Sequence, residues 1–218
     1  MKFSVEGKAL KVEGEGRFYA KLGSMVANKG KFKFEKSTFG PDSGGSLFGK
    51  VAKLAVKSVT GEKTDLMKVE GSGICYLAHN AYNIMVIKLK PSGVESSLYI
   101  ESSEVLALSD DCKVDIVALK KGGMVGGGRL FTTKVSYGGE NSYVAIILKG
   151  EPIFLEGPCN VDPQAIIAWT GKEPDIVADI NFKVIIGKSS GETFQMCFTE
   201  QGQKIIVQPA ERIINVNN

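Results

Sequence analysis

The chain has 218 residues, of which 43% are hydrophobic and 23% are charged, as is usual for a folded globular protein. Its 27 basic and 24 acidic residues leave a net charge of only +3, too small to indicate a nucleic-acid partner. No apolar run approaches the ~20 residues of a membrane-spanning helix, and the first residues lack the apolar stretch of a secretory signal. We therefore expect a cytoplasmic protein.

Short runs of β-branched and aromatic residues, separated by glycine, proline, asparagine and serine, predict strands along most of the chain. Residues 31–35, Lys-Phe-Lys-Phe-Glu, alternate strictly, which is typical of a strand with one face in solvent. Similar strand-like runs occupy residues 82–89, 142–148 and 204–208. The 26 glycines are spread over the sequence rather than gathered in one linker. The predicted fold class is mainly β.

Residues 46–57 depart from this pattern and predict a short amphipathic helix. The apolar residues of this segment recur at helical spacing, and Lys50, Lys53 and Lys57 fall together on another face. A basic amphipathic helix can bind an anionic membrane surface, so these lysines are candidate contacts with a membrane or a partner. The alternative, which we favour, is that the helix packs on its own protein and covers an open sheet edge.

A weak threefold repeat runs through the sequence. Residues 20–27, 100–107 and 161–168 each consist of an apolar residue, a charged residue, four variable or turn-like positions, an aliphatic residue and an alanine. Glycines follow each segment in the same order, after an interval that is longest in the first repeat. The predicted helix is therefore expected to be an insertion in that repeat. A unit of ~73 residues is too small for a generous core, so the units are expected to stack on one another.

This division predicts three domains: residues 1–73 with the inserted helix, residues 74–140 and residues 141–218. Both ends of the chain are strand-like, over residues 3–12 and 205–214, and neither has the polar character of a solenoid cap. Open sheet edges invite pairing with other strands. We therefore expect copies to associate head to tail, in an assembly that stays finite when it closes into a ring.

Several segments resemble the altered-inheritance-of-mitochondria family, whose bacterial members have no settled activity. Residues 161–169, Val-Asp-Pro-Gln-Ala-Ile-Ile-Ala-Trp, are similar to the Val-Asp-Pro and Val-Ala-Trp signature of that family. Residues 23–27 and 126–131 are similar to its first-repeat signature and its glycine-rich return, and the resemblance covers nearly the whole chain. It implies three tandem domains like that of the trp RNA-binding attenuation protein (TRAP), each a β-sandwich of the short double-stranded β-helix type. It also implies a ring-like homotrimer.

His79 is the only histidine, and residues 77–81 around it predict the turn after a strand. A catalytic histidine needs a nucleophile and an orienting partner, and no motif in the sequence supplies them. We therefore expect His79 to lie at the end of a hairpin and the protein not to be an enzyme. An active site formed by residues of separate chains at a subunit junction is the remaining enzymatic alternative.

Cys75, Cys112, Cys159 and Cys197 are far apart in the sequence and form no Cys-x-x-Cys pair. With one histidine in the chain, they do not make a zinc motif, and we expect reduced thiols packed as small apolar side chains. The sequence also lacks a calcium-binding loop and a phosphate-binding glycine motif. We expect no metal and no cofactor.

Residues 29–36 contain four lysines and two phenylalanines and come closest to an RNA-binding surface. Such a surface needs exposed rings among basic side chains, whereas the alternation here puts the rings on the opposite face. We expect no nucleic-acid partner, and a packed core position for Trp169. The predicted function is a non-enzymatic oligomeric scaffold or binding module of unidentified ligand. The alternative is a peripheral membrane-associated assembly factor that uses the helix at 46–57.

Overall fold

The protein is built from short antiparallel strands. Its computed structural model describes residues 1–37, 66–119, 131–178 and 194–209. The strands in these residues are β1 (Lys2–Glu6), β2 (Ala9–Lys21), β3 (Met25–Ser37), β4 (Leu66–Leu77), β5 (Asn83–Lys88), β6 (Ser97–Ile100), β7 (Val105–Ser109), β8 (Lys113–Ala118), β9 (Phe131–Ser136), β10 (Tyr143–Leu148), β11 (Ile153–Glu156), β12 (Cys159–Val161), β13 (Ile166–Thr170), β14 (Asp175–Ala178), β15 (Phe194–Phe198) and β16 (Lys204–Val207). Two 3-10 helices, η1 (Val94–Ser96) and η2 (Ser102–Glu104), flank β6. The predicted mainly β fold class is confirmed.

The strand predictions made from local pattern agree with the structure. The alternating run lies within β3, and the other three predicted runs contain β5, β10 and β16. The helix expected over residues 46–57 lies outside the described residues. The domain limits after residues 73 and 140 remain predictions; the first falls inside β4, and the second falls between β9 and β10.

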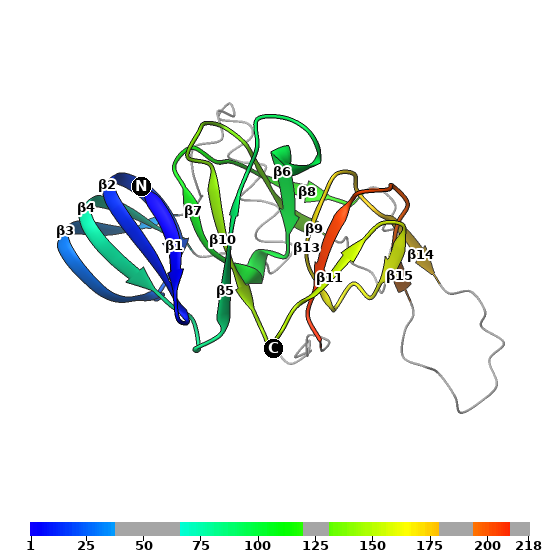
Figure 1. The fold of residues 1–218 in the computed structure, drawn as a ribbon, viewed down its shortest axis with the longest axis horizontal. Helices are drawn as coiled ribbons and strands as arrows, with labels where there is room; N and C mark the ends of the chain where they lie inside the picture. Colours follow the sequence, from blue (N-terminus) through cyan, green and yellow to red (C-terminus); the bar gives the residue numbers. More distant parts are fainter. Residues whose placement is uncertain (38–65, 120–130, 179–193, 210–218) are drawn as a thin grey trace.

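The described strands form three antiparallel sheets. The largest has the order β3-β4-β2-β7-β10-β5, with β1 also paired to β2. The second has the order β11-β16-β13-β6-β9-β8, and the third β12-β15-β14. Figure 1 shows β3 and β4 at one end of the long axis of the molecule, β7, β10 and β5 nearer its middle, and β14 and β15 at the other end.

The buried apolar side chains form three clusters in these residues. One cluster contains Phe18 and Leu106, and a second contains Ile100 and Ile146, all four fully buried. The third surrounds Trp169. Neighbouring strands of different parts of the chain thus share each core, because no short antiparallel segment can bury its apolar face alone.

Trp169 of β13 occupies the packed core position that we predicted from sequence. Its side chain is 1% exposed. The indole stacks on the ring of Tyr99 of β6, with centroids 5.1 Å apart and planes within 1°, and meets the edge of the Phe198 ring at 5.8 Å. These contacts join β6, β13 and β15 through aromatic packing, which adds to the stabilisation from buried area.

Candidate functional site

His79 lies in the turn that connects β4 to β5, as predicted. The next two residues, Asn80 and Ala81, have positive φ angles of 48° and 54°, so the chain reverses tightly at this point. The imidazole lies 6.3 Å from the ring of Tyr82. Burial and the nearby Lys21 ammonium lower the pKa of His79 from its ordinary value of 6.5. The ring is therefore neutral at pH 7.

Charged side chains from three separate segments gather near this turn. Glu104 of η2 is 1% exposed, and the Lys149 Nζ lies 2.7 Å from its Oε1. The Ser103 hydroxyl donates a hydrogen bond to the same oxygen at 3.1 Å, and the Lys21 Nζ donates to the Ser103 carbonyl at 3.0 Å. Burial lowers the pKa of Lys21. The buried Glu104 side chain thus accepts hydrogen bonds from an ammonium and a hydroxyl, which offset the cost of burying it.

Electrostatic interactions connect these side chains to His79. In the described residues, the charged groups that act on His79 are Lys21, Glu104 and Lys149. Across the described segments, no three or more His, Cys, Asp or Glu side chains are placed to hold a metal ion. These side chains form a charged junction between the ends of β2 and β10 and the helix η2.

The four cysteines are free thiols. Burial raises the pKa of Cys75 and of Cys112 to about 11, so both are protonated at neutral pH. Cys159 and Cys197 are half-buried, and burial also raises the pKa of Cys159. The prediction of buried, apolar cysteines is therefore met in full by two of them, and the other two lie nearer the surface on β12 and β15.

The lysines that we singled out from sequence, Lys50, Lys53 and Lys57, all lie outside the described residues. Their membrane or partner contact remains a prediction. In the described part of the chain, no helix is long and apolar enough to cross a bilayer.

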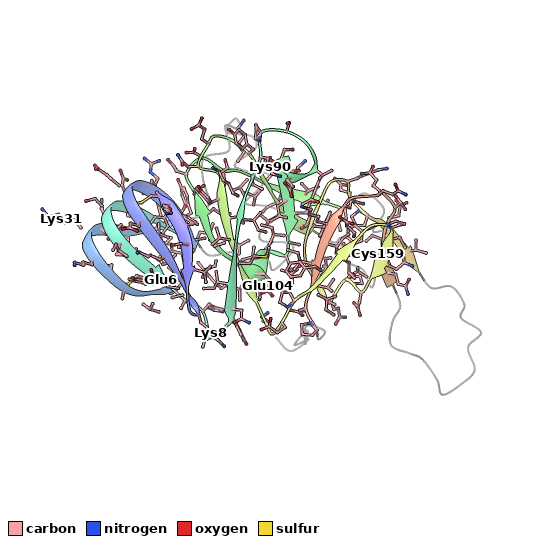
Figure 2. The ribbon with its side chains drawn as sticks, in the orientation of Figure 1. Glu6, Lys8, Lys31, Lys90, Glu104 and Cys159 are labelled. Atoms are coloured by element: carbon pink, nitrogen blue, oxygen red, sulfur yellow. The ribbon has the colours of Figure 1, made fainter. Side chains whose placement is uncertain are left out.

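Several strands have one open backbone edge in the described residues, and two of them, β3 and β12, lie toward opposite ends of the molecule. Within the described residues, β3 pairs only with β4, and β12 pairs only with β15. Figure 2 shows Lys31 of β3 at one end of the long axis and Cys159 of β12 at the other. An open edge offers unpaired N–H and C=O groups to another strand. These edges are the candidate site for association.

The edge of β3 also carries an apolar patch at its start. Leu22, Met25 and Val26 are 47%, 38% and 59% exposed. Val26 is the extra residue of a β-bulge, because Met25 lies opposite Leu77 and Ala27 lies opposite the preceding residue of β4. We did not single out this patch from sequence, although it lies in the first of the three segments that the repeat aligns.

The fold and these edges define an antiparallel β protein with strands available for lateral pairing. The chain belongs to the mitochondrial biogenesis AIM24 family, whose sequence profile matches residues 4–210. This confirms the family resemblance. The X-ray crystal structure of protein SPYM3_0169 from Streptococcus pyogenes is similar with a TM-score of 0.66 and 18% identity, over 96% of this chain and 94% of that chain. At this identity the likeness supports the fold alone. No curated protein matches the sequence.

Proposed function

We propose that the protein is a non-enzymatic oligomeric scaffold or binding module, whose copies associate head to tail into a closed homotrimeric ring in the cytoplasm. The observation that carries this proposal is the exposed apolar start of β3, because the corresponding residues elsewhere in the chain are buried. Strand pairing and bulge positions provide two criteria for which residues of the three units correspond.

A recurring scheme of strand pairing supports a division into three tandem TRAP-like units. The start of β3 pairs with the end of β4, as β7 pairs with β10 and β13 with β16. The end of β3 pairs with the start of β4, as β8 pairs with β9 and β14 with β15. The end of β2 pairs with the start of β4, as β6 pairs with β9 and β12 with β15. The same three strand pairings therefore occur within each of three sets of strands.

A β-bulge at the same place in each set supports the same correspondence. Val26 is passed over in the register between β3 and β4. Leu106 is passed over between β7 and β10, and Ile167 between β13 and β16. Each bulged residue is the seventh position of its segment in the sequence repeat. Val26, Leu106 and Ile167 therefore correspond to one another by register and by sequence.

The three corresponding residues differ sharply in burial. Leu106 is 0% exposed and Ile167 is 1% exposed, whereas Val26 is 59% exposed. The first two lie on strands with a neighbour on each side: β7 lies between β2 and β10, and β13 between β6 and β16. In the described residues, the start of β3 lacks the neighbour that would correspond to β2 or β6. The strand that corresponds to both is β12, at the other end of the molecule.

A second copy can supply the missing neighbour through its own β12. Because the two open edges lie at opposite ends of the molecule (Figure 2), the contact is head to tail. Such contacts give a filament unless the rotation closes into a ring. The number of three copies comes from the family resemblance, and the proposed absence of catalysis comes from the sequence, in which no motif supplies His79 with a nucleophile and an orienting partner.

Light scattering during gel filtration tests this proposal. The wild-type protein should have about three times the chain mass of 23.4 kDa, roughly 70 kDa for a closed trimer. Val26→Asp should shift the mass to that of one chain with an unchanged circular dichroism spectrum, because an exposed substitution leaves the fold intact. Val177→Asp on β14, where valine is 48% exposed, is the matched control and should remain trimeric. A wild-type monomer at micromolar concentration, or a trimeric Val26→Asp, would overturn the proposal.

A further inference from the structure

We infer that β12 of one copy pairs with the start of β3 of the next copy in one antiparallel register, with Val161 opposite Ala27 and Cys159 opposite Lys29. The inference rests on the proposed head-to-tail association and deepens it, since it assigns the strands and the residue pairs that form the contact between copies.

The register follows from two junctions within the chain. Ala20 lies opposite Ala107 where β2 pairs with β7, and Ile100 lies opposite Ala168 where β6 pairs with β13. In both junctions, the first residue of one repeat segment faces the last residue of the following segment. The same pairing register therefore occurs at both junctions within the chain.

One first residue and one last residue of the repeat segments take no part in these two junctions. Val161 is the first residue of the third segment, and Ala27 is the last residue of the first segment. Val161 pairs with Met196 on one side, and in the described residues neither β12 nor the start of β3 has a strand on its other side. Applying the same register between copies puts Val161 opposite Ala27. Two residues further along the antiparallel pair, Cys159 then lies opposite Lys29.

The correspondence between Val26 and Leu106 also indicates where Val26 packs on the neighbouring copy. Leu106 packs in the cluster that contains Met67, which pairs with the end of β2. Met196 pairs with the end of β12 in the same way, is 2% exposed, and belongs to the cluster around Trp169. In the assembly, Val26 of one copy packs toward Met196 of the next. This burial removes apolar area from water and stabilises the contact.

The neighbouring residue pairs distinguish the contact between copies from the junction of β6 and β13. At the junction of β6 and β13, Tyr99 lies opposite Trp169 and their rings stack. At the corresponding place between copies, Asn160 lies opposite Asn28, and both are exposed in the single chain. A polar pair replaces an aromatic one, so the contact between copies loses the stacking contribution of the internal junction. Copies can therefore separate while each chain remains folded.

Disulfide trapping tests the register with a thiol that the chain already has. Directly opposed residues of an antiparallel pair have Cα atoms ~4.5–5.5 Å apart, which is within the range of a disulfide. Lys29 is exposed, so Lys29→Cys should fold normally. Mild oxidation should then link copies into covalent dimers and trimers on a non-reducing gel, and Cys159→Ser in the same protein should abolish the link.

Lys33→Cys is the matched control on the same strand. Lys33 is exposed and lies four residues beyond Lys29, about 13 Å along the strand. It should not link copies. If the unoxidised variants have the mass of a trimer but Lys29→Cys gives no link, the register is wrong and the proposed ring stands. Linking by Lys33→Cys, or linking by Lys29→Cys that survives Cys159→Ser, would also overturn the register. A monomeric mass would overturn the ring and the register together.

Discussion

Gly30 of β3 and Gly73 of β4 lie directly opposite each other, and neither position has room for a β-carbon. A Cβ on Gly30 would lie 2.2 Å from the carbonyl oxygen of Ser72, and one on Gly73 would lie 2.1 Å from that of Lys29. The two glycines have φ angles of +140° and +128°, which other residues rarely adopt. Their close approach lets the backbones of β3 and β4 stay paired on both sides of this position.

Substitution of either glycine of this pair should destabilise the fold. Gly73→Ala should lower the free energy of unfolding by about 3 kcal/mol or more, because backbone strain and overlap with a neighbouring backbone act together. Gly7→Ala is the control: Gly7 has a φ of +59°, but a Cβ there would meet no atom within 4 Å, so this variant should lose only about 1 kcal/mol. Urea unfolding followed by the fluorescence of Trp169 measures both. Equal losses would contradict the steric explanation.

The ion pair between the buried Glu104 and the partly exposed Lys149 should contribute to stability. Lys149→Ala takes away the ammonium 2.7 Å from a carboxylate that is 1% exposed. We expect a loss of about 2 kcal/mol, between the values for exposed and for fully buried ion pairs, because the lysine is partly solvated. Lys172→Ala, whose ammonium is 3.9 Å from the exposed Glu200, should cost less than about 0.5 kcal/mol. If urea unfolding gives the same loss for Lys149→Ala as for Lys172→Ala, the pair of Glu104 and Lys149 adds no more stability than an exposed ion pair.

Glu95 should make stability depend on pH in the acid range. Hydrogen bonds from Lys204 and then Lys90 lower the pKa of Glu95 from 4.5 to about 2. Because the folded-state pKa is below the unfolded value, this contribution is complete above pH 4.5 and disappears as the pH falls toward 2. Glu95→Gln should therefore cost about 1 kcal/mol at pH 7, and less at pH 3.

The matched control for Glu95 is Glu200→Gln, which removes a carboxylate with only a distant lysine partner. Its difference from wild type should be small at every pH. Urea unfolding of both variants at pH 3, 4, 5 and 7 measures the effect. A difference between Glu95→Gln and wild type that grows on acidification would have the wrong sign and would contradict this assignment.

Most of the strand pattern was predictable from the sequence, whereas the charged group near His79 was not. Alternation and β-branched runs act within five to eight residues, so β3, β5, β10 and β16 could be located from local pattern. Lys21, Glu104 and Lys149 belong to segments far apart in the chain. No local pattern relates them, because only the pairing of β2, β7 and β10 brings their backbones together.

The sequence alone predicted that Val26, Leu106 and Ile167 hold the same place in a repeat, because all three are aliphatic residues before an alanine in segments of the same pattern. Only the tertiary structure decided that Leu106 and Ile167 are buried and Val26 is exposed. The three side chains have nearly the same hydrophobicity, so composition cannot separate them. What separates them is whether a further strand lies beside their own, and strand neighbours are set by pairing between distant segments.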